Sequence, residues 1–377
     1  MIEYLIFLAI STATFALFSL GLNLQWGFTG LINFGHIAFM TLGAYTTVLL
    51  SLKGVPLFIS AIFGAIFAAL LGLVIGFATL RLREDYLAIV TIGTGELIRL
   101  VVNNQDLPVG NTWVSGAFGV QSYPIPLSTE PNLFFRLLMI GILTLLFAVT
   151  VFSLWRWIRN AQKLQLTNST DKTSSKQEIA SRFGVGIILG LLATAIYISG
   201  VITLYNYIPK AGLMLVSLLV LAFVFWRLEY LVRSPWGRVL KAIREDEEIP
   251  KAMGKNVFWY KLQSLMLGGA IAGVAGAFFA WQLSAIYPDN FQPQLTFDSW
   301  IMVILGGSGN NIGTILGAVI YFAYDAITRE VLPKIIPLDE ARLGAFRIMC
   351  IGLILMVLMI WRPQGILGKK EELTLGK

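Results

Sequence analysis

The chain has 377 residues, of which 56% are hydrophobic and 13% are charged, and its mean hydropathy is +0.76. A soluble globular domain carries about 25% charged residues, so this composition excludes one. Continuous apolar runs, rather than alternating strands, also exclude a transmembrane β-barrel. The net charge of +7 is explained by basic cytoplasmic loops and does not indicate nucleic-acid binding.

Apolar segments follow one another along the chain, and most are long enough to cross a bilayer as a helix. Two of them, 87–101 and 298–306, are short and are interpreted either as full spans or as broken, re-entrant elements. The sequence therefore predicts an all-α, polytopic transmembrane helix bundle with about nine to eleven membrane segments in one domain, residues 1–377. The segments are 4–24, 31–52, 57–80, 87–101, 133–154, 184–204, 209–226, 264–286, 298–306, 312–328 and 344–361.

Small residues recur every four positions in several of these segments, which lets helix backbones approach closely. The segment 264–286 has such residues on two adjoining faces. The positions are Gly269, Gly273 and Ala277 on one face, Gly268, Ala272, Gly276 and Ala280 on the other, and the pairs Gly72/Gly76, Gly186/Gly190 and Gly313/Gly317 elsewhere.

Two polar stretches between the apolar segments differ in character. Residues 155–183 include a run rich in Ser, Thr, Lys and Gln, which predicts a flexible cytoplasmic insertion. Residues 102–132 contain four prolines and several glycines, which predicts a structured, turn-rich loop on the outer side.

The distribution of basic residues sets the orientation. If the last segment ends inside, alternation places 81–86, 155–183, 227–263 and 362–377 in the cytoplasm. These four regions hold 20 of the chain's 28 lysines and arginines. This asymmetry predicts a cytoplasmic C-terminus and, with eleven crossings, an outer N-terminus.

Catalytic patterns are poorly represented. The chain has one histidine and one cysteine, and Cys350 lies in an apolar run. The stretch GGSGNNIGT (306–314) lacks the lysine of a phosphate-binding loop and sits between apolar segments. We therefore expect no enzyme activity, no metal and no cofactor in this chain, and if ATP drives it, another subunit binds the ATP.

Polar side chains inside the apolar segments indicate an interior path. A charge at the centre of a lone helix costs about 2.5–3.5 kcal/mol, so such groups usually face the bundle interior or water. Glu96 and Arg99 lie three residues apart and can neutralise each other, and Asp298 is expected to cap its short segment. Asn33 and His36 are also three apart. Each has a structural alternative, an ion pair or a hydrogen-bonded packing residue, and the scattered acids argue against a proton relay.

A cytoplasmic loop at 227–263 is unusually long and charged for such an apolar chain. From Trp236 to Met253 the pattern predicts a helix that ends at Gly254. Pro250 inside this run predicts a break into two short helices.

This loop also has a small apolar face. Val239, Ala242 and Ile243 fall on one side of the predicted helix, with charged residues around the rest. Such a helix suits insertion into a groove on a partner protein, and a solvated loop helix is the alternative.

The stretch WGRVLKAIREDEEIPKAMGKN (236–256) resembles the cytoplasmic signature of ABC importer permeases, in particular branched-chain amino acid permeases of the LivM-like type. Their version runs approximately G-R-x-x-x-A-I-R-E-D-E-x-A-A-x-x-L-G. The resemblance spans nearly the whole chain except 155–183, and it continues through 23–45, 82–104, 261–280 and 306–320.

The resemblance implies a permease of the bacterial inner membrane that forms half of a translocation path for branched-chain or other neutral amino acids. It implies two cytoplasmic ATP-binding subunits, a second related permease and an extracytoplasmic substrate-binding protein as partners. The residues implied in coupling to the ATPase are Gly237, Arg238, Ala242, Arg244, Glu245, Glu248 and Gly254. The candidates for the path are Asn33, His36, Glu96, Arg99 and Asp298.

The chain departs from the family pattern in its outward loop. Family members usually carry a T-G-G-x-x-G stretch where this chain reads PVGNTWVSGAFG (108–119), which leaves the choice of substrate open. A urea or amide importer permease is therefore an alternative. A stand-alone ion-coupled carrier is an alternative of another class.

Overall fold

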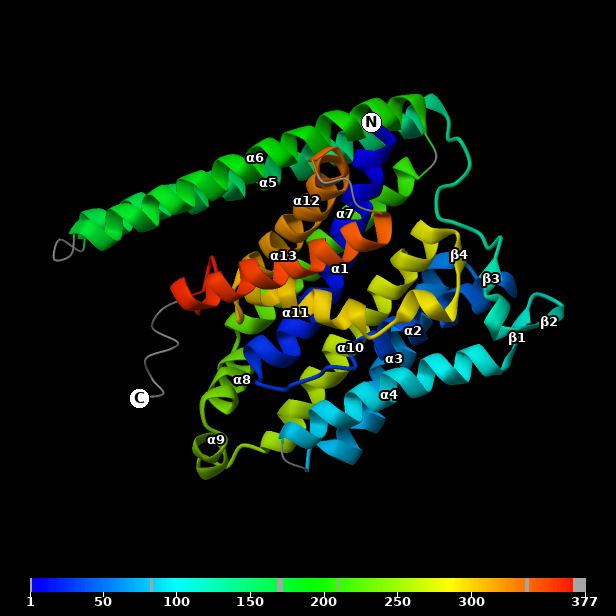
Figure 1. Cartoon of the computed structure of the whole chain (residues 1–377), viewed down its shortest axis with the longest axis horizontal. Coiled ribbons are helices and arrows are strands. Elements are labelled where there is room, and N and C mark those ends of the chain that lie inside the picture. Colours follow the sequence, from blue (N-terminus) through cyan, green and yellow to red (C-terminus); the bar gives the residue numbers. More distant parts are fainter. Residues whose placement is uncertain (1, 82–83, 168–171, 209, 336–338, 369–377) are drawn as a thin grey trace. The chain divides into compact units, whose positions relative to one another are not determined.

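The computed structural model describes residues 2–81, 84–167, 172–208, 210–335 and 339–368 (Figure 1). These residues are mainly helical, which confirms the predicted all-α class. The α-helices are α1 (Ile2–Asn23), α2 (Ile37–Leu52), α3 (Leu57–Thr79), α4 (Glu84–Asn104), α5 (Leu133–Thr167), α6 (Lys172–Asn206), α7 (Ala211–Arg233), α8 (Pro235–Glu245), α9 (Glu248–Ala252), α10 (Val257–Leu283), α11 (Gln294–Gly306), α12 (Asn311–Ile335) and α13 (Glu340–Trp361).

Shorter elements join these helices. A π-helical turn, η1 (Leu24–Phe28), continues α1, and the 3-10 turns η2 (Gly116–Phe118) and η3 (Pro288–Phe291) lie in loops. Two small antiparallel sheets are formed by β1 (Asp106–Val109) with β2 (Thr112–Ser115) and by β3 (Val120–Gln121) with β4 (Ala285–Ile286). The outer stretch 102–132 is therefore structured, as predicted.

The described helices agree with a multi-pass membrane protein. Eight of them are long and apolar enough to cross a bilayer, and a bent pair formed by Pro288–Gly306 and Asn311–Ile335 brings the number to nine. The two halves of that pair meet at 118°, so the short segment 298–306 belongs to a broken or re-entrant element, one of its two predicted alternatives. The other short segment, 87–101, lies within the continuous helix α4.

One predicted segment starts later than expected. The apolar run 31–52 becomes helical only at Ile37, and the residues before it form an irregular segment that contacts other parts of the chain. The backbone N–H of Phe34 donates to Thr91 Oγ1 (3.2 Å). A Cβ on Gly35 would lie 1.7 Å from the Thr91 carbonyl oxygen, so this backbone packs directly on α4.

The Cα positions divide into two compact units. One unit contains Met1–Ala9 and Leu127–Leu219, and its main feature is the long pair α5 and α6, which lie side by side (Figure 1). Phe147 and Tyr197 stack across this pair, with ring centroids 4.5 Å apart. The predicted insertion 155–183 is helical wherever it is described, and its residues 168–171 lie outside the described part.

The other unit contains Ile10–Pro126 and Val220–Lys377, and α10 packs at its core against α2 and α3. Close backbone contacts make this possible: a Cβ on Gly273 would meet Ala68 at 2.7 Å, and one on Gly276 would meet the Met40 carbonyl oxygen at 2.1 Å. The predicted small-residue faces of this helix are thus confirmed. In the first unit, Gly190 was also predicted to allow close helix packing, but nothing lies within 4 Å of a Cβ placed on it.

The loops of this second unit gather at two ends. At one end β3 pairs with β4, which joins two loops predicted to be outside. At the other end the Arg81 guanidinium lies 5.7 Å from the centre of the Phe258 ring, which joins two regions predicted to be inside. Each of these contacts joins regions that the predicted alternation places on the same side of the membrane.

Candidate functional site

The charged loop forms two short helices, α8 and α9, as predicted (Figure 1). The break lies at Asp246, whose backbone is extended (φ −160°, ψ 118°) and whose Oδ1 accepts a hydrogen bond from the Glu248 N–H (2.9 Å). The prediction that Pro250 breaks the helix is wrong. Pro250 is the third residue of α9, and N–H groups of a first helical turn have no intrahelical partner, so a proline fits there.

The apolar side of α8 is turned into the chain itself. Gly237, Leu240 and Ile243 are buried, and Leu240 packs in a cluster with Leu24 and Phe28. Of the predicted face, Ile243 is buried within the chain, and Val239 and Ala242 are half-buried. That this face docks on a partner stays a prediction.

Apolar surface remains at the tip of the loop instead. Ile249 is 56% exposed and Met253 is 64% exposed, both in or next to α9. The charged residues Arg238, Glu245 and Glu248 are exposed on the same pair of helices. The tip thus combines two apolar side chains with a charged rim.

One ion pair joins the start of α9 to α10. Lys261 on α10, whose side chain is only 9% exposed, contacts Glu247, the residue before α9. Within α9 itself, Lys251 contacts Glu248 (2.8 Å). Because Lys261 is on α10, the tip of the loop is fixed to a membrane-spanning helix rather than hinged freely.

Two glycines of the predicted coupling set have local structural reasons. A Cβ on Gly237 would lie 2.2 Å from the Val232 carbonyl oxygen, so α8 can follow α7 this closely only with glycine there. Gly254 has φ +74°, a left-handed conformation that glycine adopts without strain, and its N–H donates to the Lys251 carbonyl (2.9 Å). It ends α9 as predicted.

The remaining two residues of that set face inward in part. Ala242 and Arg244 are half-buried on α8. The Arg244 guanidinium donates to the Gly27 carbonyl oxygen (2.5 Å), 217 residues away in the sequence. No pattern in the sequence connects these two positions.

Asn33 is completely buried and hydrogen-bonded within the bundle. Its Nδ2 donates to Gln25 Oε1 (2.9 Å), its Oδ1 accepts from the Gly35 N–H (3.0 Å), and its carbonyl accepts from Trp300 Nε1 (3.1 Å). In this conformation Asn33 shapes the irregular segment before α2.

His36 is also completely buried, at the start of α2. Its Nε2 lies 3.1 Å from the Phe18 carbonyl oxygen, and its ring packs against Phe18 and Phe39. Its Nδ1 has no hydrogen-bond partner within the described part of the chain. Asn33 and His36 are therefore neighbours, both closed off from solvent.

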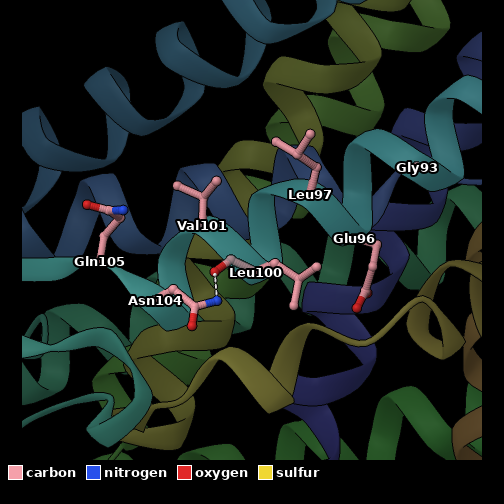
Figure 2. Close-up of a pocket in the computed structure, with 7 residues that line it drawn as sticks. All are labelled: Gly93, Glu96, Leu97, Leu100, Val101, Asn104 and Gln105. Carbon is pink, nitrogen blue, oxygen red and sulfur yellow. Dashed lines mark hydrogen bonds between the residues drawn. The ribbon is translucent and has the colours of Figure 1, made fainter.

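Glu96 and Arg99 form the predicted ion pair. Arg99 donates to both carboxylate oxygens of Glu96 (2.5 and 3.0 Å) and also to Asp289 on η3 (2.9 Å). Glu96 lines an open groove of about 490 Å³ along one face of α4 (Figure 2). The other lining residues are Gly93, Leu97, Leu100, Val101, Asn104 and Gln105.

Asp298 does not cap its helix, because α11 begins four residues earlier at Gln294. It lies one turn inside α11, half-buried, and accepts from Gln294 Nε2 (3.3 Å) and from Tyr321. Nearby, Asp325 pairs with Arg329 (2.7 Å) and Arg347 (3.6 Å).

The five candidate path residues thus fall into three places, and sequence reasoning missed Arg347 among the charges near Asp298. Arg347 stood out only as a base inside an apolar run. A second missed group is the chain Asn23, Asn311 and Glu229, linked by hydrogen bonds of 3.2 Å each. In the described residues no three histidines, cysteines or carboxylates gather closely enough to hold a metal ion.

Comparisons with known proteins agree with this architecture. The family model described as "Branched-chain amino acid transport system / permease component" matches residues 4–163 and 137–360. The high-affinity branched-chain amino acid transport system permease protein LivM of Salmonella typhimurium is 28% identical over 365 residues, which cover 96% of this chain and 69% of that protein.

LivM of Escherichia coli is likewise 28% identical, over 362 residues with the same coverage of both chains. A probable branched-chain amino acid transport permease protein LivM of Methanocaldococcus jannaschii is 29% identical over 157 residues, 40% of this chain and 45% of its own. No solved structure matches. Since the family model covers nearly all of the membrane region, the chain belongs to the family of branched-chain amino acid transport system permease components.

Proposed function

We propose that this chain is the transmembrane permease subunit of an ABC importer that carries branched-chain or other neutral amino acids into a bacterial cell across its inner membrane. The observation that carries the proposal is the α8–α9 loop, a signature-bearing element held firmly to the bundle and bearing an exposed tip. The family match over the membrane region supports it.

The partners follow from the division of labour in such an importer. Two cytoplasmic ATP-binding subunits would hydrolyse ATP, so this chain would need no cofactor of its own. An extracytoplasmic binding protein would deliver the substrate, and a second related permease would complete the path. In this arrangement the permease is a two-state element that its partners bias from both sides.

We propose that the ATP-binding subunit docks on the solvent-exposed side of α8 and α9. Arg238, Glu245 and Glu248 supply exposed charges there, and Ile249 and Met253 supply apolar contact. Gly237, Ala242 and Gly254 would act indirectly, by setting the position of these helices against α7 and the end of α9.

The path is proposed to run past the part-exposed charged groups of the spans. Glu96 has 37% of its side chain exposed about half-way along α4, a position where lipid would be an unfavourable neighbour for a carboxylate. Arg99 lies beside it, and Asp298 has only neutral hydrogen-bond partners among the described residues. Asn33 and His36 would join the path only if the segment before α2 moves.

Reconstitution into liposomes tests the function. The chain, a second permease, the ATP-binding subunits and the binding protein are combined, and uptake of labelled leucine, isoleucine, valine, alanine and urea is measured. We expect uptake of branched-chain amino acids that requires both ATP and every partner. Uptake by this chain alone would refute the proposal, and uptake of urea alone would move the substrate class to the amide importers.

A further inference from the structure

The C-terminal end of α1 has an unusual backbone. The helix ends in the π-helical turn η1 (Leu24–Phe28), and 78% of the apolar span formed by the two elements is buried. Single π-turns are rare and frequently occur at functional sites. The backbone groups of this turn therefore need a complete account.

The first carbonyls of the turn are satisfied close by. Leu24 accepts from the Thr29 hydroxyl (3.0 Å) and from Ser264 on α10 (3.2 Å). Gln25 accepts from the Leu31 N–H (2.9 Å), in the segment that follows. These bonds tie the turn to its own continuation and to α10.

The Gly27 carbonyl is different, because its donor comes from the signature loop. Arg244 on α8 reaches back to it at 2.5 Å, a charge-assisted bond at a helix C-terminus, where a cation is favoured. The stem of Arg244 also packs on Gly30, where a Cβ would make ordinary contact with Arg244 Cγ (3.4 Å) but the φ of +83° favours glycine. Lys241, one turn earlier on α8, lies over the Phe28 ring at 5.6 Å.

The same end of α1 connects onward to two other elements. Asn23 Oδ1 accepts from the Gly309 N–H (2.9 Å), and Asn23 Nδ2 donates to Asn311 (3.2 Å), both at the bend between α11 and α12. Gln25 accepts from Asn33 in the irregular segment before α2. The turn η1 is thus bonded to α8 and to the segment that precedes His36, and Asn23, the residue just before the turn, is bonded to the α11–α12 bend.

From this arrangement we infer that Arg244 is a positioning residue inside the permease, which caps η1 and carries movement of α8 to the α11–α12 bend and the segment before α2. The inference rests on the proposed function, since α8 moves only if a partner moves it. It assigns Arg244 a different role from Arg238, which is exposed on the same helix.

Paired substitutions in the reconstituted importer separate these roles. We expect Arg244→Gln to leave co-purification of the ATP-binding subunits intact and to lower substrate uptake per ATP hydrolysed on the order of tenfold, as loss of one charge-assisted bond implies. Arg244→Lys should recover part of this coupling, because it keeps a cation at the helix end. Arg238→Gln should show the opposite pattern, with weaker association and normal uptake per ATP in the complexes that form.

Either of two results overturns the inference: Arg244→Gln with wild-type uptake per ATP, or Arg244→Gln that loses association as Arg238→Gln does. If the wild-type importer shows no ATP-dependent uptake of any tested substrate, the proposed function is refuted. The inference is then refuted as well, because it depends on that function.

Hydrogen exchange on the unaltered importer covers the case in which the Arg244 variants do not fold. Residues 24–31 should change protection together with 235–245 when ATP and vanadate trap the closed ATP-binding subunits. Protection in 24–31 that stays constant while that of 235–245 changes would overturn the inference.

Discussion

The exposed tip of the signature loop allows the energy of docking to be worked out. Ile249 is 56% exposed and Met253 is 64% exposed, so a partner can still bury a little over half of each side chain. Complete burial of such a side chain is worth about 1.5–3 kcal/mol, which makes the two together worth about 2–3.5 kcal/mol in the complex. Replacing both by serine should therefore weaken the affinity for the ATP-binding subunit by about 30-fold to 400-fold.

The assay is titration of the purified ATP-binding subunit against the permease pair in detergent or nanodiscs, with bound subunit as the readout. Phe118→Ser is the matched control, because Phe118 is a 73% exposed apolar residue in the loop predicted to face outward. We expect that control to bind the subunit normally. If the Ile249→Ser, Met253→Ser double variant binds within twofold of wild type, the tip does not dock and the reasoning fails.

Three further outcomes follow from particular contacts. Asp298→Asn should lower uptake at least tenfold with ATP-binding subunits still attached, since it neutralises a part-exposed charge in α11, and unchanged uptake would remove Asp298 from the path. Leu240→Ala should destabilise docking of α8 on η1 by about 2–5 kcal/mol, seen as faster amide exchange in 235–245 alone, and unchanged exchange would contradict its burial. Glu247→Gln should destabilise α9 by about 1.5–3 kcal/mol, measured by amide exchange in 248–252. Adding Lys261→Met should restore part of that stability. If the effects of the two substitutions are simply additive, the two residues do not act as a pair.

Much of the helical layout is predictable, because membrane spans are encoded locally. Each predicted apolar segment lies largely within a helix of the structure, and the short segment 298–306 was placed among the possible re-entrant elements. Where a predicted helical residue is not helical, specific hydrogen bonds explain the difference. Residues 31–36 were predicted to belong to an apolar helical segment but are irregular, since hydrogen bonds from this stretch go to α4 and to Gln25 rather than to a helical turn.

The site was less predictable because its contacts join distant parts of the chain. Glu96 and Arg99 were predicted as a pair from their spacing alone, and the pair is present. Hydrophobic periodicity, by contrast, could not say which stripe of α8 is buried, because that depends on Phe28 and Leu24. The partner of Arg244 is a backbone carbonyl, which carries no side-chain signal at all.

The polar side chains within the membrane spans differ in how far they are buried, and this difference indicates which of them can line a translocation path. Asn33 and His36 are completely buried, and each has a hydrogen-bond partner within the chain. Glu96 and Arg99 remain part-exposed on α4, a span of which only 22% is buried within the chain. A charged pair facing lipid there would be costly, so we expect this face of α4 to meet water or the second permease in the assembled importer. If the proposed function holds, we expect the groove beside Glu96 to form one wall of the path and the second permease to form another.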